Sequence, residues 1–390
     1  MTQNTLRTNG QSQQRELATG LKADAGGLSG MTRRRRLDAF LDRHDLDVVW
    51  FARPNSFIWL TGGSNVVDRA SPVGVAAVGY DGEWRVLTDS IEADRIEREE
   101  LPELAATVID YPWYEMTLPE AIAEHTDGTG GADLDVPGLQ RIDPSPLRQP
   151  LTDREMDRYR DLGRETAEAV ESVCRDVQAD DSESTVATAI EIALTYRGID
   201  APVVLVGGGE RAPQYRHYTP TDADVGEYAL VSVTARRRGL HASCTRTIAF
   251  DPPTWLNERH RAAARVETTA LAATRRLAGD DGTAGDVFAR MQNAYDTLGH
   301  DGEWRHHHQG GAAGYAGREW IATPDHEASL TMPMAYAWNP TVAGAKSEDT
   351  VLVTADGFET VTSTGEWPTR TTAAVDAALE LDRPEPLVLD

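Results

Sequence analysis

The sequence has little cysteine, little lysine and no long apolar run. Cys174 and Cys244 are its only cysteines, too few for a disulfide framework in 390 residues and typical of a reducing compartment. No stretch approaches the roughly 18 apolar residues that a membrane-spanning helix needs. The first residues, MTQNTLRTNG, are polar and lack the apolar segment of a secretory signal. We therefore expect a cytoplasmic protein with no membrane partner.

Lysine occurs only at Lys22 and Lys346, so arginine supplies nearly all of the positive charge. With 38 basic and 63 acidic residues, the formal net charge is −25. This balance argues against nucleic acid as a partner, because nucleic acids attract basic surfaces. A dispersed acidic surface with little lysine resembles the proteins of salt-accumulating halophiles of the haloarchaeal type. Molar salt, in which the Debye length is about 3 Å, screens such self-repulsion. The sequence thus predicts a high-salt cytoplasm, and the alternative of an acidic mesophilic protein fits the lysine shortage less well.

Alternating helix-type and strand-type patterns predict an α/β protein with two domains. The first thirty residues are polar and aperiodic, as in a disordered tail. Residues 126–150 are rich in Gly, Pro and Asp, which is typical of an interdomain linker. The predicted parts are a tail (1–30), an N-terminal domain (31–125), a linker (126–150), a second domain (151–372) and a C-terminal tail (373–390).

Local signals predict individual elements. The basic run from Arg33 to Arg36 is interpreted as the solvated first turn of a helix rather than as a nucleic-acid site. Thr152 followed by Glu155 forms a capping box, so a long helix is expected from there to about Val177. Further helices are predicted over 186–196, 255–278 and 284–298, and strands over 48–51, 73–78, 84–87, 107–111, 334–338, 350–354 and 359–361.

Two apolar runs on either side of Gly239 predict a β-hairpin over residues 228–250. Residues on one face of a hairpin meet in space. Ser232 and Ser243, eleven positions apart across the turn, are therefore expected to face one pocket. The second strand contains the run Thr245-Arg246-Thr247.

This hairpin resembles the paired-aspartate hairpin of the pita-bread family, peptidase family M24, in which two Asp with ten residues between them precede a Thr-Arg-Thr run. Ser232 and Ser243 stand at the two Asp positions. The run from Asn55 to Gly62 resembles the start of the small N-terminal domain in the branch of Xaa-Pro aminopeptidases, prolidases and creatinases. The resemblance implies a small creatinase-like α/β domain followed by a pita-bread domain, overall α/β (α+β).

The family holds two divalent metals between two Asp, one His and two Glu, and the resemblance locates the remaining ligand positions. Gly311 stands at the His position and Asn339 at the first Glu position, whereas Glu348, in Glu-Asp-Thr, is retained. A metal pair brings about four positive charges that carboxylates must balance, and hydroxyls, an amide and a glycine do not do so. By this resemblance, four of the five metal ligands are lost. We therefore expect that the two metals are absent and that no cofactor is bound.

Other positions are assigned by the same resemblance. Arg318 stands where the family has a catalytic histidine, and Glu319 follows it; His217 fits a substrate-side histidine. His306, His307 and His308 would alternate faces on a strand, so a structural or cleft-lining role, with His307 in the cleft, is favoured over a metal site. Arg246 is expected to line the cleft and to be a plausible partner of Glu348.

Two hypotheses about function follow. The favoured one is a pseudopeptidase without metals that binds a small molecule or short peptide, by analogy as a homodimer. The alternative is a creatinase-like, metal-independent hydrolase of a C–N bond, with His217, Glu319 and Glu348 as acid and base groups. An ion pair from Arg318 to Glu348 or Glu319 would favour the first hypothesis, and a His–Glu pair within hydrogen-bond reach would favour the second.

Overall fold

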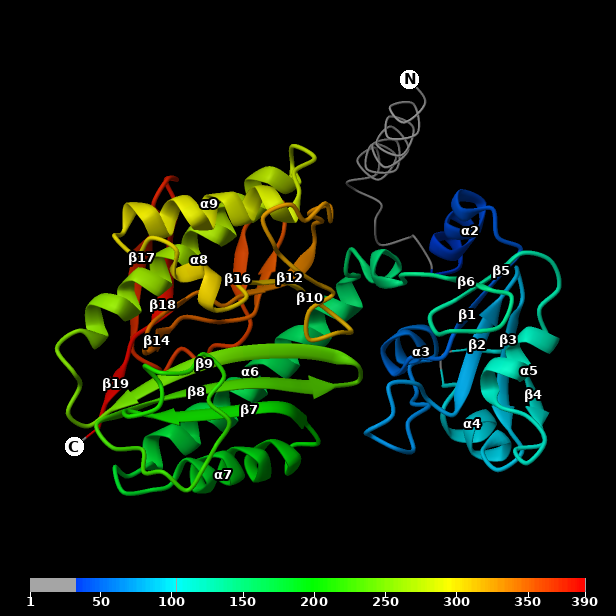
Figure 1. Ribbon diagram of the computed structural model, residues 1–390, viewed down its shortest axis with the longest axis horizontal. Coiled ribbons are helices and arrows are strands. Elements are labelled where there is room, and N and C mark those ends of the chain that lie inside the picture. Colours follow the sequence, from blue (N-terminus) through cyan, green and yellow to red (C-terminus); the bar gives the residue numbers. More distant parts are fainter. Residues whose placement is uncertain (1–32, 103, 390) are drawn as a thin grey trace. The chain divides into compact units, whose positions relative to one another are not determined.

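The computed structural model describes residues 33–102 and 104–389 (Figure 1). The predicted tail over residues 1–30 lies outside them. The described chain forms two compact units, one that ends at Gln149 and one that begins at Pro150. Both are mixed α/β structures, as the sequence predicts.

The N-terminal unit is built on a six-stranded sheet in the order β4-β3-β2-β1-β5-β6. Its centre is apolar because β1 and β2 are buried along their whole length, with Trp50 and Leu87 in the core between sheet and helices. The helix over Pro54–Thr61 is followed by Gly62, which takes the left-handed conformation (φ 78°) and caps it. The elements are α2 (Arg33–His44), β1 (Val48–Phe51), α3 (Pro54–Thr61), β2 (Ala76–Tyr80), β3 (Trp84–Asp89), α4 (Ala93–Glu99), β4 (Thr107–Tyr111), α5 (Leu118–Glu124), β5 (Gly130–Ala132), β6 (Gln140–Arg141) and η2 (Ser145–Arg148).

The predicted linker over residues 126–150 is wrong for most of its length, because this stretch belongs to the N-terminal unit. Strand β5 pairs in parallel with β1, and β6 pairs in parallel with β5. Asp133 is buried and accepts a hydrogen bond of 2.8 Å from the amide of Ala52. A buried strand made of Gly-Gly-Ala has no alternating side chains, so its composition resembles that of a loop.

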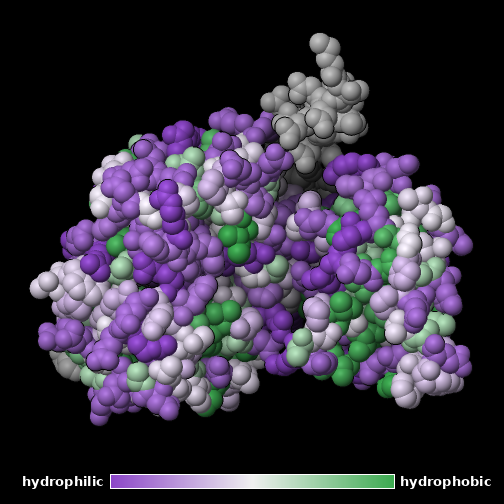
Figure 2. All heavy atoms as spheres, in the orientation of Figure 1, coloured by the Kyte–Doolittle hydropathy of each residue, from purple (hydrophilic) through white to green (hydrophobic). Residues whose placement is uncertain are grey.

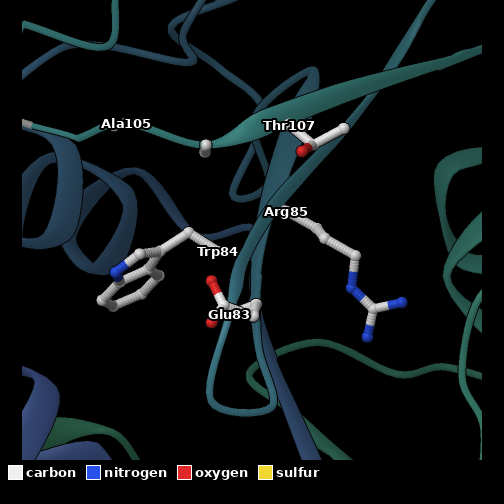
Figure 3. A pocket seen from close by; sticks show the side chains of 6 residues that line it. Glu83, Trp84, Arg85, Ala105 and Thr107 are labelled. Carbon is white, nitrogen blue, oxygen red and sulfur yellow. The ribbon is translucent and has the colours of Figure 1, made fainter.

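An open hollow of about 570 Å³ lies on the N-terminal unit beside β3 and β4. Figure 3 shows Glu83, Trp84 and Arg85 with Ala105 and Thr107 at this place. Arg85 forms an ion pair with Asp81 at the neighbouring turn. None of the residues that line this hollow is among the candidate site residues.

The C-terminal unit contains a four-stranded sheet, β19-β9-β8-β7, and a five-stranded sheet, β11-β10-β12-β15-β16. Helices α6 and α7 pack on the first sheet, and α8 packs against α9 and the strands of the second (Figure 1). The elements are α6 (Asp153–Asp176), α7 (Glu183–Thr195), β7 (Asp200–Gly208), β8 (Tyr228–Arg237), β9 (Leu240–Ala249), α8 (Leu256–Ala278), α9 (Ala284–Thr297), η3 (Glu303–His306), β10 (Gly310–Ala313), β11 (Trp320–Ile321), β12 (Met334–Trp338), β13 (Thr341–Val342), β14 (Ala345–Lys346), β15 (Val351–Val353), β16 (Phe358–Thr360), β17 (Thr369–Ala373), β18 (Glu380–Pro384) and β19 (Leu387–Val388).

The predicted helices of this unit are confirmed. Helix α6 begins with the expected capping box, in which Thr152 accepts from the amide of Glu155 and the Glu155 carboxylate accepts from the amide of Thr152 at 2.8 Å. Helices α8 and α9 lie within one residue of their predicted bounds. Helix α7 begins at Glu183, three residues before the prediction, because Ser182 caps it. No helix in the described ranges is long and apolar enough to cross a membrane.

The predicted C-terminal tail over residues 373–390 is wrong, because its described residues are folded. Strands β17 and β18 form a hairpin, and β19 pairs in parallel with β9. Arg383, only 1% exposed, donates to Glu267 on α8 at 2.8 Å. The two polar, mostly exposed strands of the hairpin lack the apolar alternation that predicts a strand.

Candidate functional site

The hairpin of β8 and β9 forms the floor of the site. Its turn has positive φ at Arg238 (49°) and Gly239 (82°), which suits a tight hairpin turn. The register places Ser232 opposite Thr245 and Thr234 opposite Ser243. The two serines therefore share one face, and each bonds to the threonine across from it, at 2.8 Å for Ser232 and 2.9 Å for Ser243.

Two cationic side chains hold the carboxylate of Glu348. Lys346 Nζ lies 2.7 Å from Oε2, and Arg318 Nη2 lies 2.8 Å from Oε1. Thr245 donates a further hydrogen bond of 2.9 Å to Oε2. Burial alone would raise the pKa of Glu348, but the charges of Lys346 and Arg318 lower it to about 2. The carboxylate is therefore ionised at neutral pH, and both of its oxygens are engaged.

Lys346 is the candidate site residue that sequence reasoning missed. It lies on β14, is 5% exposed, and its Nζ is also 3.3 Å from Ser232 Oγ. Ser232 in turn contacts the hydroxyl of Tyr218 at 3.0 Å. One signal could have found it: Lys346 stands two positions before Glu348 in a strand-rich region, and side chains two apart in an extended chain share a face.

Arg318 lies against the other end of the hairpin face. Its Nη1 donates to Ser243 Oγ at 3.2 Å and to the carbonyl of Gly317 at 2.7 Å. The ion pair with Glu348, one of the two predicted for this residue, is present. Arg318 therefore links Ser243 of the hairpin to the carboxylate of Glu348.

Glu319 supports the turn that presents Arg318. Its Oε1 accepts from the amides of Tyr315 at 2.8 Å and Ala316 at 3.3 Å, and the side chain is 9% exposed. Because the amides of Tyr315 and Ala316 both donate to this oxygen, Glu319 holds the backbone of the turn before Arg318 in place. The contacts place Glu319 in a structural role beside the site.

Gly311 provides no side-chain ligand, and Asn339 provides only an uncharged amide. A Cβ at Gly311 would lie 2.2 Å from the carbonyl oxygen of Trp320 and 2.8 Å from its ring, so a histidine here would require β11 to move. Asn339 is 3% exposed, and its Oδ1 has no hydrogen-bond partner within the described parts of the chain. The residues present do not fit a pair of divalent metals.

Arg246 does not line a cleft and does not pair with Glu348, contrary to both expectations. It is 1% exposed, and it bonds to Glu171 on α6 at 3.0 Å and to Asp349 at 3.1 Å. Alternation along β9 explains the error. Ser243 and Thr245 face the site, and Arg246, one residue on, points to the opposite face of the sheet.

Three histidines gather beside this network. The Nε2 atoms of His217 and His307 are 3.2 Å apart, and the rings of His307 and His308 stack with centroids 4.4 Å apart. The strand expected for the histidine run is wrong: η3 ends at His306, which lets two consecutive rings lie together. Burial, with the nearby charge of Lys346, lowers the pKa of His217, and burial with Arg318 lowers that of His308 to about 4.

His217 also borders an open hollow of about 560 Å³ on the C-terminal unit. Gln214, Tyr215 and Arg216 line it from one segment, and Glu303 and His306 line it from another. Arg216 and Glu303 form an ion pair that joins the two segments. The hollow is thus polar, and its wall at His217 leads to the histidine group.

Comparisons with known proteins agree with this geometry. The model of metallopeptidase family M24 matches residues 157–355. A search of curated protein sequences finds no match. Among solved structures, the prolidase from Pyrococcus furiosus is similar with a TM-score of 0.70 and 19% identity, covering 84% of this chain and 99% of that one.

Two further structures share the fold over similar lengths. The Xaa-Pro dipeptidase from Bacillus anthracis has a TM-score of 0.67 and 16% identity, covering 92% of this chain and 99% of that one. The N-terminal domain of FACT complex subunit SPT16 from chickpea (Cicer arietinum) has a TM-score of 0.65 and 14% identity, covering 86% of this chain and 97% of that one. At these identities the likeness concerns the fold.

Proposed function

The chain belongs to metallopeptidase family M24, and we propose that it is a member without the dinuclear metal chemistry that binds a small molecule or short peptide. The observation that carries the proposal is the pair of cations on Glu348. Lys346 and Arg318 engage its two oxygens at 2.7 and 2.8 Å. In this proposal the protein is a pseudopeptidase with a binding or regulatory role.

Charge balance supports the loss of the metal pair. Of the five positions that carry ligands in the family, only Glu348 has a charged side chain, and Lys346 and Arg318 turn the local formal charge from −1 to +1. Two divalent ions would add about four positive charges to a buried cluster that is already cationic. Such charges repel strongly where the effective dielectric constant is low.

The hollow beside His217 supports a binding role. Its volume of about 560 Å³ is within the usual range for small-molecule sites, roughly 300–1,000 Å³. Arg216, Gln214 and Tyr215 supply donors for a polar ligand such as a dipeptide. The structurally similar chickpea domain is described as part of a complex subunit rather than as a peptidase, which supports by fold-level analogy a binding use of this scaffold.

The contacts give the creatinase-like alternative less support. A general base works best with a pKa near the operating pH, whereas that of Glu348 is lowered to about 2. Glu319 accepts from two backbone amides, and the hydrogen-bonding neighbour of His217 is His307. We therefore propose no hydrolase activity.

The direct test uses an Xaa-Pro dipeptide such as Ala-Pro as both ligand and substrate. Calorimetry in molar KCl should detect binding that is weakened by Arg216→Ala, and chromatography should detect no hydrolysis with or without added Mn²⁺ or Co²⁺. Arg290→Ala, an exposed arginine on α9, is the matched control for loss of an arginine. Metal-dependent cleavage that is lost in Glu348→Gln would overturn the proposal.

We further propose that the protein works in the high-salt cytoplasm of a halophile. Figure 2 shows a face of the C-terminal unit covered mostly by hydrophilic residues. The formal net charge of −25 and the presence of only two lysines support the proposal. Dispersed acidic charge repels itself unless salt screens it.

A further inference from the structure

We propose that His217, His307 and His308 form a binding site for a single divalent transition-metal ion, distinct from the positions that hold two metals in the family. One ligand atom from each histidine lies within 4.8 Å of the other two. Among the residues that the structure describes, these three are the group of His, Cys, Asp or Glu side chains whose ligand atoms lie close enough together to bind one ion. The proposal does not depend on the proposed function.

The spacing of the ring nitrogens fits coordination. Zinc binds imidazole nitrogen at about 2.0–2.1 Å in tetrahedral geometry, which places two ligand nitrogens roughly 3.3 Å apart. The Nε2 atoms of His217 and His307 are 3.2 Å apart. His308 stacks on His307, and its ring centroid is 5.8 Å from that of His217. Two nitrogens are thus at ligand spacing, and the third ring lies beside them.

The hydrogen bonding of the three rings leaves nitrogen atoms unused. The Nδ1 atom of His308 is buried and has no hydrogen-bond partner in the described ranges, so its lone pair is available to an ion. His307 as a whole is only 8% exposed. A buried polar atom without a partner costs free energy, about 1–3 kcal/mol. A bound ion, which takes up imidazole lone pairs, would explain why three such rings are kept together.

The backbone on both sides of the site is fixed. Gln309 donates to the carbonyl of His307 at 2.6 Å and accepts from the hydroxyl of Tyr295 on α9 at 2.8 Å. On the other side, the ion pair of Arg216 and Glu303 ties the segment of His217 to η3. Ligands held this way need little rearrangement to bind an ion.

The ligand chemistry selects the metal. Imidazole suits Zn²⁺, Cu²⁺, Ni²⁺ and iron, whereas Mg²⁺, Ca²⁺ and Mn²⁺ prefer oxygen ligands. Three neutral ligands leave the two charges of the ion uncompensated, so the fourth ligand is expected to be an anion. The exposed side of His217 borders the hollow of about 560 Å³, through which such an anion would reach the ion.

The test is equilibrium binding of Zn²⁺ alone to the full chain in molar KCl at neutral pH. We expect one ion per chain. The double variant His307→Ala/His308→Ala should lose at least ~100-fold in affinity for Zn²⁺, because loss of a group that merely hydrogen-bonds a metal ligand already costs 10–100-fold. His44→Ala is the matched control: this exposed histidine on α2 lies outside the group and is not among the residues that line the hollow, so the variant should bind Zn²⁺ like the unmodified protein.

A second variant and a second readout keep the proposal testable. If the double variant fails to fold, His217→Ala replaces it, because His217 is exposed. The visible spectrum of the Co²⁺-loaded protein should have the strong bands of four-coordinate cobalt and lose them in either variant. No Zn²⁺ binding, or binding that survives loss of these histidines, would overturn the inference.

These results also separate the inference from the proposed function. One ion that depends on the histidines and persists in Glu348→Gln supports the inference and leaves the proposed function intact. Two ions that depend on Glu348 would contradict the proposed function. That result would also contradict the inference if the histidine variants kept both ions.

Discussion

Glu348 is the buried carboxylate of the candidate site, and its role depends on the two cationic residues that contact it. In a metal site its oxygens would face cations from solution, whereas here they face Lys346 and Arg318. The motifs alone align Ser232, Ser243, Gly311 and Asn339 with ligand positions of the family, and the loss of the metals stays a prediction. The role of Lys346 could not be predicted from the motifs, because it arises from contacts between β14 and the hairpin that no local pattern records.

Replacing Glu348 by Gln should destabilise the protein strongly. It leaves the charges of Lys346 and Arg318 buried without their partner, and breaking a buried ion pair costs about 3–5 kcal/mol. Lys346→Met should cost less, because Arg318 still pairs with the carboxylate. Urea unfolding in molar KCl measures both. Equal stability of Glu348→Gln and the unmodified protein would refute the ion-pair account.

His260 predicts a pH dependence of stability. The side chain is buried on α8, and burial lowers its pKa from 6.5 to about 4. Between these values the unfolded chain binds a proton that the folded chain does not. The contribution to stability is therefore complete above pH 6.5 and is lost as the pH falls towards 4, by about 3 kcal/mol.

His260→Gln should make the stability profile less steep between pH 6.5 and 4, where His241 and His308, whose pKa values burial also lowers to about 4, still contribute. Thermal unfolding across this range compares the variant with the unmodified protein. His306→Gln, at an exposed position, is the control and should keep the original slope. A variant profile as steep as the original would show that His260 is not the titrating group.

At the scale of elements, capping signals and apolar alternation predicted the long helices and the central hairpin well. The errors fall where those signals are absent: the Gly-Gly-Ala strand β5, the polar hairpin of β17 and β18, and the turn that brings His307 and His308 together. In each case the structure depends on partners distant in sequence. Strand β5 needs β1, and the C-terminal hairpin needs α8.

Arg383 should anchor the C-terminal hairpin. It is buried against Glu267 on α8, at 2.8 Å, and donates to Thr360 at 2.7 Å. Arg383→Met would leave Glu267 buried without that partner and should cost about 3–5 kcal/mol in urea unfolding.

Arg370→Met is the control for this change, because Arg370 is an exposed residue of the neighbouring strand β17 whose partner is Glu385. Exposed ion pairs are worth about 0–1 kcal/mol, so this variant should stay close to the unmodified protein. Similar losses in the two variants would contradict the anchoring role of Arg383.

For the whole molecule, charge is the dominant property. A net charge of −25 opposes compaction at low ionic strength. The homodimer expected from the family stays a prediction, and sedimentation in molar KCl tests it. The two units and their order follow from the resemblance, whereas the acidic composition predicts the conditions under which they are stable.

The free energy of unfolding should rise steadily from 0.1 M to molar KCl as the salt screens repulsion between acidic side chains. Thermal unfolding at a series of KCl concentrations measures the effect. Sucrose of matched osmolality is the control, because sucrose is excluded from the protein surface but does not screen charge. Maximal stability at low salt would contradict the assignment to a high-salt environment.

The central claim is that the dinuclear centre is lost, and calorimetric titration with Mn²⁺ tests it most directly. Mn²⁺ prefers the carboxylate ligands of a dinuclear site and binds weakly to imidazole groups, so it reports on the family's site rather than on the three histidines. We predict no Mn²⁺ binding by the full chain at neutral pH in molar KCl. Two ions bound per chain, with loss of both in Glu348→Gln, would contradict the account.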